Sequence, residues 1–586
     1  MVLKYSLRWL VILLLGLLIY GQAFQFGFVF DDKLYIVSNP YIRDFSHVYL
    51  MWHFFPMTRL VGMNSFALNY FFNQLHPQGY HIFNLIVHFI AVGLVWALAS
   101  LLFKITKWLP SKDRLVNELP FIIAVFFLVH PCQTQAVTYI SQRFESMATV
   151  FYLGTVYCYL RGRTTIRKSH KFGLFGLAGL LTILGLLTKE VIITVPAMLL
   201  ASEWILFPNP CAVIPAKAGI HNKIGRHRYL ILIVCGILLY LLFTKLVHAD
   251  LSIFLQTVPS DSHDGDVLTP KRYFLTQMRV FLTFLRLLVW PMHQNADYDY
   301  PASTGLLHPP LTLVGLGVIG CIIFLIIKLR RNAPLIAFGL AWVLITFSIN
   351  LAPRSNLIFE HKLYLISFGF ILAMVALLSN LVRERGTLMR ILCCLIAVLA
   401  LVSYQRNKVW KDALTLWDDT VHQSPHKARP YNNRGAAYSS QGNFTQAILD
   451  YSKAIEIKPD YADAYFNRGN NYGHQGNFTQ AIFDYNEAIK LNSDNLQAYN
   501  NRGFAYFQKG SFNQAISDYN HSIEINPYFA GPYYNRAISY YHLNKYDEAW
   551  HDVHKAQELG ADVDPGFISA LKEKSPDMWR ERPLRK

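Results

Sequence analysis

The sequence predicts an all-α protein, with a polytopic membrane domain followed by an α-solenoid. Two observations support this prediction. First, 53% of the 586 residues are hydrophobic, and residues 1–405 contain many apolar stretches long enough to cross a bilayer. Second, from residue 428 onward these stretches give way to a 34-residue period, which is typical of stacked helix pairs. We therefore expect domains at residues 1–405 and 406–586.

About 20 apolar residues cross a bilayer as a helix, and by this measure the first domain has about eleven spans. We expect them near residues 6–24, 80–103, 119–138, 145–161, 172–188, 190–207, 229–247, 311–329, 334–350, 363–382 and 388–404. The stretch 273–291 is different, because Arg279 and Arg286 are seven residues apart and share one helix face. There we expect an amphipathic or re-entrant helix at the outer membrane surface.

The formal charge of +17 does not indicate a nucleic-acid partner. Residues 406–586 contain 21 basic and 21 acidic side chains, so the whole excess lies in the membrane domain. With the spans above, one side of the membrane has 21 basic and 4 acidic residues, and the other has 12 of each. Cytoplasmic loops are enriched in Lys and Arg. We therefore place Asp31, the 248–272 loop and the repeats on the side opposite the cytoplasm.

The repeats are expected near residues 428–461, 462–495, 496–529 and 530–563, with helix pairs at 428–457, 462–491, 496–525 and 530–559. Four arginines mark the period: Arg434, Arg468, Arg502 and Arg536. Trp410 and Trp417 keep the same register one period earlier, which predicts a degenerate half repeat at 406–427. Stacked repeats form a concave groove. The recurring Asn433, Asn467 and Asn501 either line it and bind peptide backbone or serve packing and turns, and both interpretations stay open.

Two adjacent carboxylates, Asp31 and Asp32, directly follow the first span in the stretch 28–32. The simplest interpretation is a solvated loop, because charges are mostly solvated. However, a loop of 55 residues, 25–79, contains the pair, and loops of this length are often functional. Carboxylates near a bilayer are unfavourable unless they face water, a partner or a substrate.

A series of short motifs runs through the first domain. In chain order they are Asp31-Asp32, Arg59-Leu60, Gly79-Tyr80-His81 with Asn84 and His88, His130-Pro131, Arg143-Phe144-Glu145, Lys189-Glu190, and Pro291 with Asp297-Tyr298. This order resembles the C superfamily of membrane glycosyltransferases. With the repeats, the chain most resembles the transmembrane and tetratricopeptide-repeat protein O-mannosyltransferases and their bacterial relatives. That family often has Arg-Pro-Leu where this chain has Thr58-Arg59-Leu60, and Glu-Arg before a tyrosine where this chain has His361-Lys362.

The resemblance implies transfer of a sugar, mannose by the family name, from a polyprenyl-phosphate donor to a protein hydroxyl outside the cytoplasm, with inversion. The repeats would bind the acceptor. Such a reaction needs a carboxylate base, for which Asp31 is preferred over Asp32, and cations on the leaving phosphate. The phosphate-binding candidates are Arg59, Arg143, Lys189, Arg354, His361 and Lys362, and the other pocket candidates are His81, Asn84, His130, Glu145, Glu190, Tyr298 and Tyr364.

Structural roles are the alternatives for several of these residues. Arg143 and Glu145 can pair with each other, Lys189 and Glu190 can form a local ion pair, and His81 and His88 can be interior histidines. No third ligand stands at the spacing of a metal site, and a requirement for a divalent metal stays open. No CxxC motif occurs among the seven cysteines, so neither a disulfide framework nor a zinc site is expected.

Two other functions compete with protein glycosylation. One is sugar transfer to a lipid or glycan acceptor, and the other is a membrane scaffold without enzymatic activity that presents the repeats. A scaffold leaves the paired carboxylates, the outer-face cations and the long first loop unexplained. We expect a bacterial inner membrane protein whose site faces the periplasm, because the chain is compact, has few repeats and ends without a retrieval signal.

Overall fold

The computed structural model describes residues 2–44, 57–108, 115–207, 236, 258–259, 267–354 and 356–576. It consists of two compact units, Met1–Gln423 and Ser424–Lys586. Both are helical, as the sequence predicts, with a single pair of two-residue strands, β1 (Val258–Pro259) and β2 (Val267–Leu268), among the described residues.

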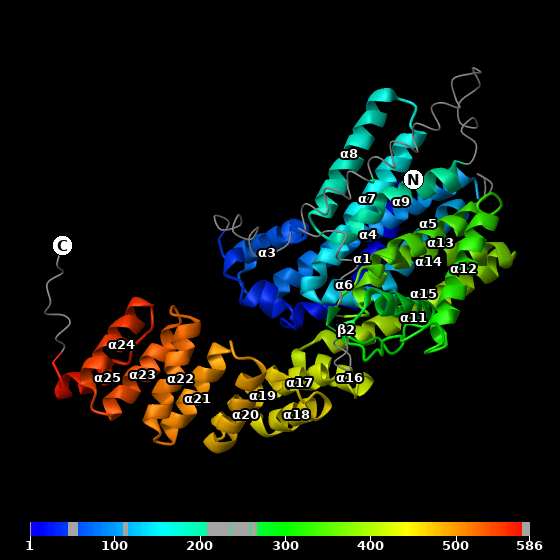
Figure 1. Cartoon of the computed structure of the whole chain (residues 1–586). Helices are drawn as coiled ribbons and strands as arrows, with labels where there is room; N and C mark the ends of the chain where they lie inside the picture. Colours follow the sequence, from blue (N-terminus) through cyan, green and yellow to red (C-terminus); the bar gives the residue numbers. More distant parts are fainter. Residues whose placement is uncertain are drawn as a thin grey trace. The chain divides into compact units, whose positions relative to one another are not determined.

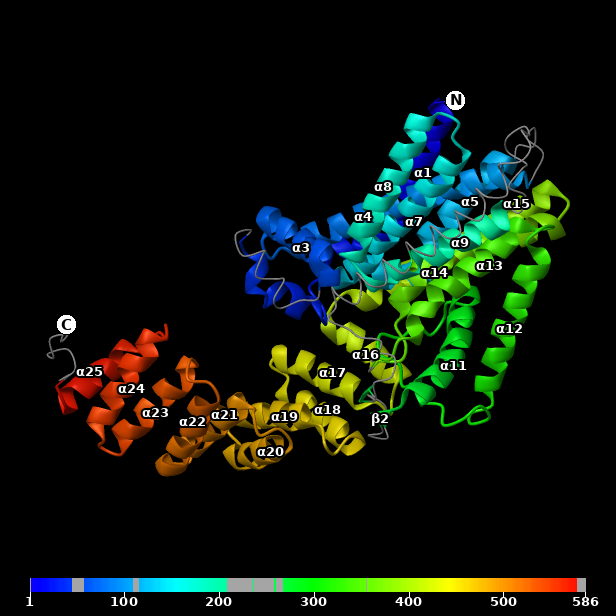
Figure 2. The same ribbon diagram turned by 45° about the horizontal axis from the view of Figure 1, so that its top comes forward.

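The first unit is a bundle of helices (Figures 1 and 2). Its described α-helices are α1 (Val2–Tyr20), α3 (Leu60–Asn73), α4 (Pro77–Thr106), α5 (Leu115–Val129), α6 (Thr134–Thr138), α7 (Arg143–Thr164), α8 (Lys168–Leu186), α9 (Val195–Leu206), α11 (Pro270–Val289), α12 (Leu311–Leu329), α13 (Pro334–Phe347), α14 (Leu363–Leu381), α15 (Arg385–Asn407) and α16 (Ala413–Gln423).

Seven described helices are long and apolar enough to cross a membrane, or eight if the bent pair α5–α6 is one span. The count of eleven remains a prediction. Of the other three expected spans, 145–161 is part of α7, and 190–207 is divided between a short 3₁₀ helix, η8 (Glu190–Thr194), and α9. The third, 229–247, lies outside the described residues apart from Gly236. Helix α11, expected to be amphipathic, is not among the seven.

Helix packing in the first unit uses small residues where two helices approach closely. Helix α4 packs against α5 and α7, and α13 packs against α14. A Cβ on Gly339 would lie 2.4 Å from the Gly369 carbonyl oxygen, and one on Gly369 would lie 2.6 Å from that of Gly339. Small residues allow this kind of approach in membrane helix pairs.

A break after α5 shapes the region around the paired carboxylates. The helix ends at Val129, and the chain turns by 56° into the segment that begins at Pro131. Proline lacks an N–H and keeps the preceding residue extended, and His130 has a ψ of 129°. The break brings Tyr139 and Ser141 beside the Asp31–Asp32 turn, as described below.

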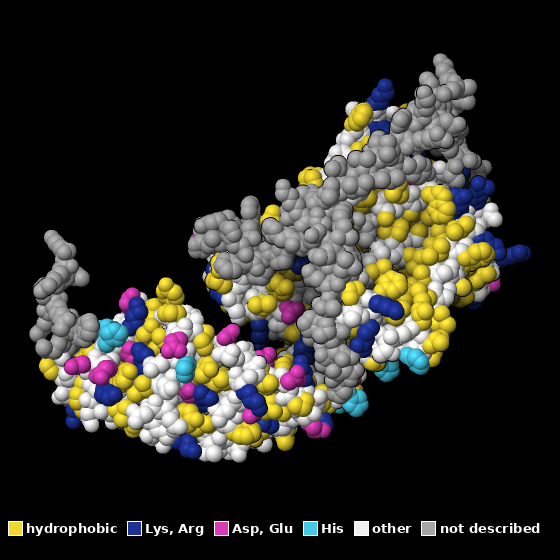
Figure 3. Space-filling view, viewed as in Figure 1, with side chains coloured by type: hydrophobic (Ala, Val, Ile, Leu, Met, Phe, Trp, Pro, Cys, Tyr) yellow, Lys and Arg dark blue, Asp and Glu magenta, His cyan; other side chains and the backbone are white. Residues whose placement is uncertain are grey.

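The surfaces of the two units differ in composition. Figure 3 shows hydrophobic side chains gathered over the first unit, and helix α12 exposes Leu313, Phe324 and Ile327 by half or more of their surface. On the repeat unit the visible face mixes hydrophobic side chains with both signs of charge. A lipid-facing helix needs an apolar exterior, whereas a mixed surface is typical of a water-soluble domain.

The repeat unit consists of antiparallel helix pairs (Figure 1). The pairs end within one residue of the predicted positions, and a further helix, α25 (Pro565–Lys574), follows the last pair. The helices are α17 (Ala428–Ser440) and α18 (Phe444–Ile457), α19 (Ala462–His474) and α20 (Phe478–Leu491), α21 (Leu496–Gln508) and α22 (Phe512–Ile525), and α23 (Ala530–His542) and α24 (Tyr546–Glu558).

The recurring arginine makes the same ion pair in each repeat. In the second repeat, Arg468 Nη2 and Nε donate to the two carboxylate oxygens of Asp484 at 2.7 and 2.8 Å. The next residue, Gly469, leaves room for Tyr485, because a Cβ there would lie 2.8 Å from the tyrosine ring. The equivalent ion pairs are Arg434–Asp450, Arg502–Asp518 and Arg536–Asp552.

Replacing Arg468 with alanine should raise the free energy of the folded second repeat by about 3 kcal/mol, the typical cost of breaking a buried pair. The Asp484 side chain is fully buried, and burial already raises its pKa while Arg468 opposes that shift. Hydrogen exchange of the full-length protein should show faster opening of α19 and α20.

Lys490 is the control for this measurement. It pairs with Glu487 at the surface of α20, and exposed pairs contribute at most about 1 kcal/mol. Equal exchange in the Lys490→Ala and Arg468→Ala variants would contradict the stabilising role of the buried pair.

The boundary between the units lies after Gln423, rather than between residues 405 and 406. The predicted half repeat at 406–427 contains α16, which belongs to the first unit. There Leu416 and Trp417 are buried in a cluster with Ala23, Phe26 and Val29. The 34-residue register predicts an apolar face on this helix but does not identify the surface that the face contacts. Here that surface belongs to the first unit.

Candidate active site

The Asp31–Asp32 pair lies in a tight turn beyond the first span. A 3₁₀ helix, η1 (Gly21–Gln25), follows α1, and a short π-helix, η2 (Lys33–Val37), follows the pair. Phe30 has a φ of 49°, a left-handed conformation that is uncommon for a bulky residue. The surrounding packing therefore has to maintain this turn.

Asp32 holds the turn together. Its side chain is fully buried, and its two carboxylate oxygens accept backbone N–H groups, Oδ2 from Val29 at 3.0 Å and Oδ1 from Ser141 at 2.7 Å. Burial raises the pKa of Asp32 to about 7, although the hydrogen bonds from Val29 and Ser141 oppose the shift. A pKa near 7 suits a general base, but geometry decides first, and both oxygens are already in use.

Asp31 is the partly exposed member of the pair. Its backbone N–H donates to the Tyr139 hydroxyl at 2.9 Å. The Tyr35 phenol interacts electrostatically with Arg59, Asp31 and Glu190, so Tyr35 links the Asp31 turn to the basic residues described next. This exposure and position favour Asp31 over Asp32 as the base.

Four basic side chains from distant parts of the chain meet two carboxylates, and we call them the cation cluster: Arg59, Lys189, Arg354 and Lys362. Lys189 Nζ lies 2.8 Å from Glu145 Oε2. Glu190 has two partners, with Arg354 Nη2 at 2.8 Å and Arg59 Nη1 at 3.5 Å. Lys362 is buried and interacts electrostatically with Arg354, Glu190, Lys189 and Glu145. The alternative pairings, Arg143 with Glu145 and Lys189 with Glu190, are not the ion pairs that form.

Basic side chains outnumber acidic ones in the cation cluster. Within the described residues, four basic side chains contact or closely face two carboxylates, and they remain in excess if Asp31 is also counted. Buried charge is unfavourable unless it is paired. The arrangement therefore favours binding of an anion.

Two buried nitrogens at the cluster make no hydrogen bond. In the described part of the protein, Arg59 Nη1 has only the ion pair with Glu190 at 3.5 Å, and His361 Nδ1 has no hydrogen-bond partner. Buried donors are normally satisfied by protein, water or ligand. Together with the excess of basic side chains, these two atoms identify the side of the cluster where the oxygens of an anion would bind.

Arg143 is better explained by a structural role than by the expected phosphate contact. It is fully buried. Its Nε donates to Asn84 Oδ1 at 2.6 Å, Nη1 to the Ser65 carbonyl at 3.1 Å, and Nη2 to the Tyr80 carbonyl at 3.1 Å. These bonds join α3, α4 and α7, and they occupy every nitrogen of the guanidinium group.

Most of the other pocket candidates also contact protein groups. Asn84 Nδ2 donates to the carbonyls of Val137 and Ile140, His88 Nδ1 lies 2.6 Å from the Tyr364 hydroxyl, and His130 Nε2 donates to the Leu288 carbonyl at 3.0 Å. His81 differs, because its polar neighbour is the backbone of Phe26 and its ring nitrogens make no hydrogen bond of regular geometry in the described structure. Its ring packs edge-on against Phe26.

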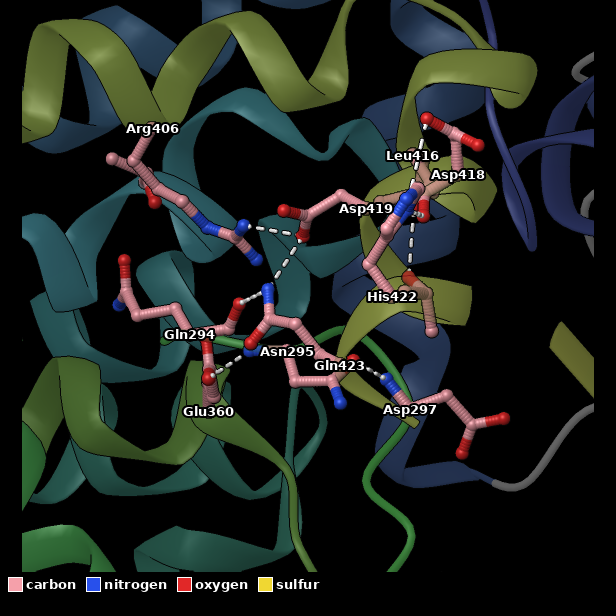
Figure 4. Close-up of polar contacts among 12 residues, drawn as sticks. Gln294, Asn295, Asp297, Glu360, Arg406, Leu416, Asp418, Asp419, His422 and Gln423 are labelled. Atoms are coloured by element: carbon pink, nitrogen blue, oxygen red, sulfur yellow. Dashed lines mark hydrogen bonds and ion pairs between the residues drawn. The ribbon is translucent and has the colours of Figure 1, made fainter. Parts of the chain in front are cut away.

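A second polar network surrounds Glu360 (Figure 4). Glu360 Oε1 accepts the Tyr298 hydroxyl and the Asn295 N–H, the latter at 2.6 Å. Glu360 begins the 3₁₀ helix η11 (Glu360–Lys362), so this helix has Glu360 in one network and Lys362 in the cation cluster. The sequence reasoning missed Glu360, Tyr35 and Tyr139. Glu360 could have been found from the sequence because it directly precedes His361. Tyr35 could have been found because it follows Asp31 by four residues.

Potential metal ligands do not cluster in the described part of the chain. Across the ranges that the structure describes, no three His, Cys, Asp or Glu side chains gather in a way that could hold a metal ion. The cysteines described are free thiols.

The repeat unit contains a groove of about 530 Å³. Asn467 and Asn501 line it, whereas Asn433 does not. Side-chain amides form a ladder beside it, in which Asn467 Nδ2 donates to Asn432 Oδ1 and Asn501 Nδ2 to Asn470 Oδ1. The twelve lining residues, all described, include no Lys, Arg, Asp or Glu: Ala436, Ser439, Ser440, Tyr451, Asn467, Asn470, Asn471, Gly473, His474, Tyr485, Asn501 and Phe504.

Comparison with family models confirms the repeats. Models described as TPR repeat and tetratricopeptide repeat match residues 435–476 and 469–510, 496–529, and 518–551. Among solved structures, MamA is 25% identical, covering 25% of this chain and 85% of that chain, with a TM-score of 0.24. The Arabidopsis OM64 TPR domain is 23% identical, covering 20% of this chain and 95% of that chain, with a TM-score of 0.19.

Comparison with curated proteins finds relatives over most of the chain. Protein O-mannosyl-transferase Tmtc3 of Drosophila melanogaster is 25% identical over 525 residues, 77% of this chain and 55% of that protein. Human Protein O-mannosyl-transferase TMTC3 is 24% identical over 495 residues, 75% of this chain and 50% of that protein. The chain resembles the protein O-mannosyl-transferases. It spans about half the length of these mannosyl-transferases, and the match confirms the family resemblance expected from the motifs.

Proposed function

We propose that the protein is a membrane glycosyltransferase that moves mannose from a polyprenyl-phosphate donor to a hydroxyl of a protein acceptor. The observation that carries the proposal is the excess of buried cations beside a partly exposed carboxylate. The names of the relatives support a protein acceptor and mannose. The charge asymmetry of the loops supports a site outside the cytoplasm.

The proposed reaction is a single displacement. Asp31 removes the proton of the acceptor hydroxyl while that oxygen attacks the anomeric carbon of the sugar. The bond between this carbon and the phosphate oxygen breaks, and the electron pair leaves with the polyprenyl phosphate, which gains one negative charge. Arg59, Lys189, Arg354 and Lys362 stabilise that charge, because preorganised cations act most strongly where charge develops. One attack from the face opposite the phosphate inverts the anomeric centre.

An apolar groove beside the cluster suits the start of the polyprenyl chain. It has a volume of about 260 Å³ and is lined by Ile193, Thr194, Ala197, Ser348, Ile349 and Ala352. Glu190 lies three residues before Ile193, and its partner Arg354 lies two residues after Ala352. A lipid phosphate at Arg354 would therefore have an apolar surface next to its first isoprene unit.

The groove of the repeat unit suits an extended, uncharged peptide segment. Its amides, hydroxyls and aromatic rings can bind backbone groups and Ser or Thr side chains, and no charged residue lines it to select an acidic or basic segment. Hydroxyl-rich segments are also the ones that can accept a sugar on oxygen. We therefore propose that the repeats bind the acceptor polypeptide.

Replacing both Asn467 and Asn501 with alanine should raise the acceptor KM by about 5- to 25-fold, since each neutral hydrogen bond contributes about 1 kcal/mol. The donor KM should stay unchanged. Steady-state transfer to a Ser/Thr-rich polypeptide measures both constants. Asn433→Ala is the matched control, because Asn433 holds the same repeat position outside the groove. An unchanged acceptor KM in the double variant would remove the groove from the acceptor site.

The experiment that tests the function is transfer of radiolabelled mannose from mannosyl phosphoryl polyprenol by the full-length protein in lipid nanodiscs. Label on Ser or Thr of a polypeptide supports the proposal. Label only on lipid or glycan indicates the alternative acceptors, and the absence of any transfer leaves a scaffold that presents the repeats.

A further inference from the structure

Residues 408–423 pack against the Asp31 turn. Trp410, Leu416 and Trp417 are each at most 3% exposed, and they form one apolar cluster with Ala23, Phe26, Val29 and Tyr139. The backbone adds a link, because the Gly27 N–H donates to the Lys411 carbonyl at 3.3 Å. This segment therefore contributes to the first unit a wall against which the turn rests.

Aromatic rings connect this wall to Asp31. Trp410 stacks on Tyr139, with ring centroids 5.1 Å apart and planes 14° apart. The ring of Phe30, the residue before Asp31, lies between Tyr139 at 6.1 Å and Trp417 at 5.0 Å. The Tyr139 hydroxyl in turn accepts the Asp31 N–H. Trp417 thus packs on the residue with positive φ, whose conformation sets the direction of the Asp31 side chain.

The other end of α16 joins the Glu360 network (Figure 4). Asp419 Oδ2 lies 2.7 Å from Arg406 Nη1 and accepts Gln423 Nε2 at 2.9 Å. Gln423 Nε2 also donates to the Gln294 carbonyl at 2.8 Å, and the next residue, Asn295, donates its N–H to Glu360. Because η11 runs from Glu360 to Lys362, α16 contacts the supports of both the base and the phosphate cations.

We propose that α16 is a positioning element of the active site and that Trp417 is a positioning residue for Asp31. The helix had the register of a half repeat, yet its apolar face holds the Phe30–Asp31 turn. This inference rests on the proposed function in one respect, namely that Asp31 is the base. If the base loses its orientation, the rate of transfer falls. The phosphate contacts that bind the donor are unaffected.

Trp417→Ala should lower kcat by about 10-fold or more, because catalysis is sensitive to misplacement of a base by about 1 Å. The donor KM should remain within about twofold. Trp417→Phe keeps a ring against Phe30 and should retain most of the activity. Phe30→Ala removes the same contact from the other side, and the double variant should therefore be little slower than either single variant.

Trp550→Ala is the matched control, since Trp550 is equally buried but lies in α24 of the repeat unit. Its kcat at saturating acceptor should equal that of the wild type. An unchanged kcat in Trp417→Ala, a donor KM that rises as much as kcat falls, or an equal loss in Trp550→Ala would overturn the proposal.

Hydrogen exchange of the full-length protein provides a readout that needs no activity. The amides of residues 26–37 should exchange faster in Trp417→Ala than in the wild type. Their exchange rate in Trp550→Ala should equal that of the wild type. If the wild type transfers no mannose but this exchange difference appears, the proposed function fails while the support of the turn by α16 stands. If the exchange of residues 26–37 is unchanged, α16 does not position the turn, whatever the activity.

Discussion

Replacing Asp31 with asparagine should lower the turnover number by about 10²–10⁴-fold, the usual contribution of a general base. Asparagine keeps the size of the side chain but cannot accept the proton of the attacking hydroxyl. Donor binding should largely survive, because the phosphate contacts come from the cation cluster. Single-turnover transfer of radiolabelled mannose at saturating donor measures the rate, and equilibrium binding of polyprenyl phosphate measures the affinity.

Asp32→Asn is the control for the neighbouring carboxylate. Its two oxygens accept the N–H groups of Val29 and Ser141. In asparagine the NH₂ group replaces one of these oxygens, and it cannot accept a hydrogen bond from the backbone N–H. This variant should therefore lose thermal stability, with turnover falling only as far as the turn is disturbed. Wild-type transfer in both single variants would remove the catalytic role of the pair and leave a membrane scaffold as the best interpretation.

Replacing Arg59 with glutamine should weaken binding of polyprenyl phosphate by about 10- to 100-fold, since hydrogen bonds to charged groups contribute about 1.5–3 kcal/mol. In the described structure Arg59 Nη1 makes no hydrogen bond and has only the ion pair with Glu190 at 3.5 Å, so it can donate to the phosphate. The turnover number should fall as well, because the phosphate gains charge as it leaves.

Arg163→Gln is the matched control for Arg59→Gln. Arg163 also pairs with a buried glutamate of the first unit, with its Nη2 3.0 Å from Glu203 Oε2, but it is not a member of the cation cluster. Its affinity for polyprenyl phosphate should equal that of the wild type. If both variants bind the phosphate as tightly as the wild type, the donor site lies elsewhere.

The fold was largely predictable because its patterns are local. Apolar length identified most long helices of the first unit, but not α3 (Leu60–Asn73), which lies within the expected loop 25–79. The 34-residue period located each helix pair to within one residue, since all four repeats contain the same Arg–Asp pair and the first three share close packing at Gly435, Gly469 and Gly503. The position of α16 was not predictable. Trp410 and Trp417 fit the repeat register, but their partners Phe26 and Tyr139 are hundreds of residues away in the sequence.

The site was predictable by residue type more than by role. The sequence named Arg59, Lys189, Arg354 and Lys362, and the structure brings them together. It also named Arg143, whose nitrogens are used by Asn84 and two backbone carbonyls. Ion-pair partners depend on which helix faces meet, so the neighbours Lys189 and Glu190 pair with different residues, Glu145 and Arg354. The spacing of residues in the sequence does not predict these pairs.

A structure of the full-length protein with polyprenyl phosphate bound tests the donor site most directly. We predict that the phosphate lies among Arg59, Lys189, Arg354 and Lys362, within hydrogen-bond distance of Arg59 Nη1. The first isoprene unit should lie against Ile193, Ala197 and Ile349, and the Asp31 carboxylate should face the side of the phosphate where the sugar would be. A phosphate bound away from these cations, with the cluster still closed by its own ion pairs, would contradict the proposed active site.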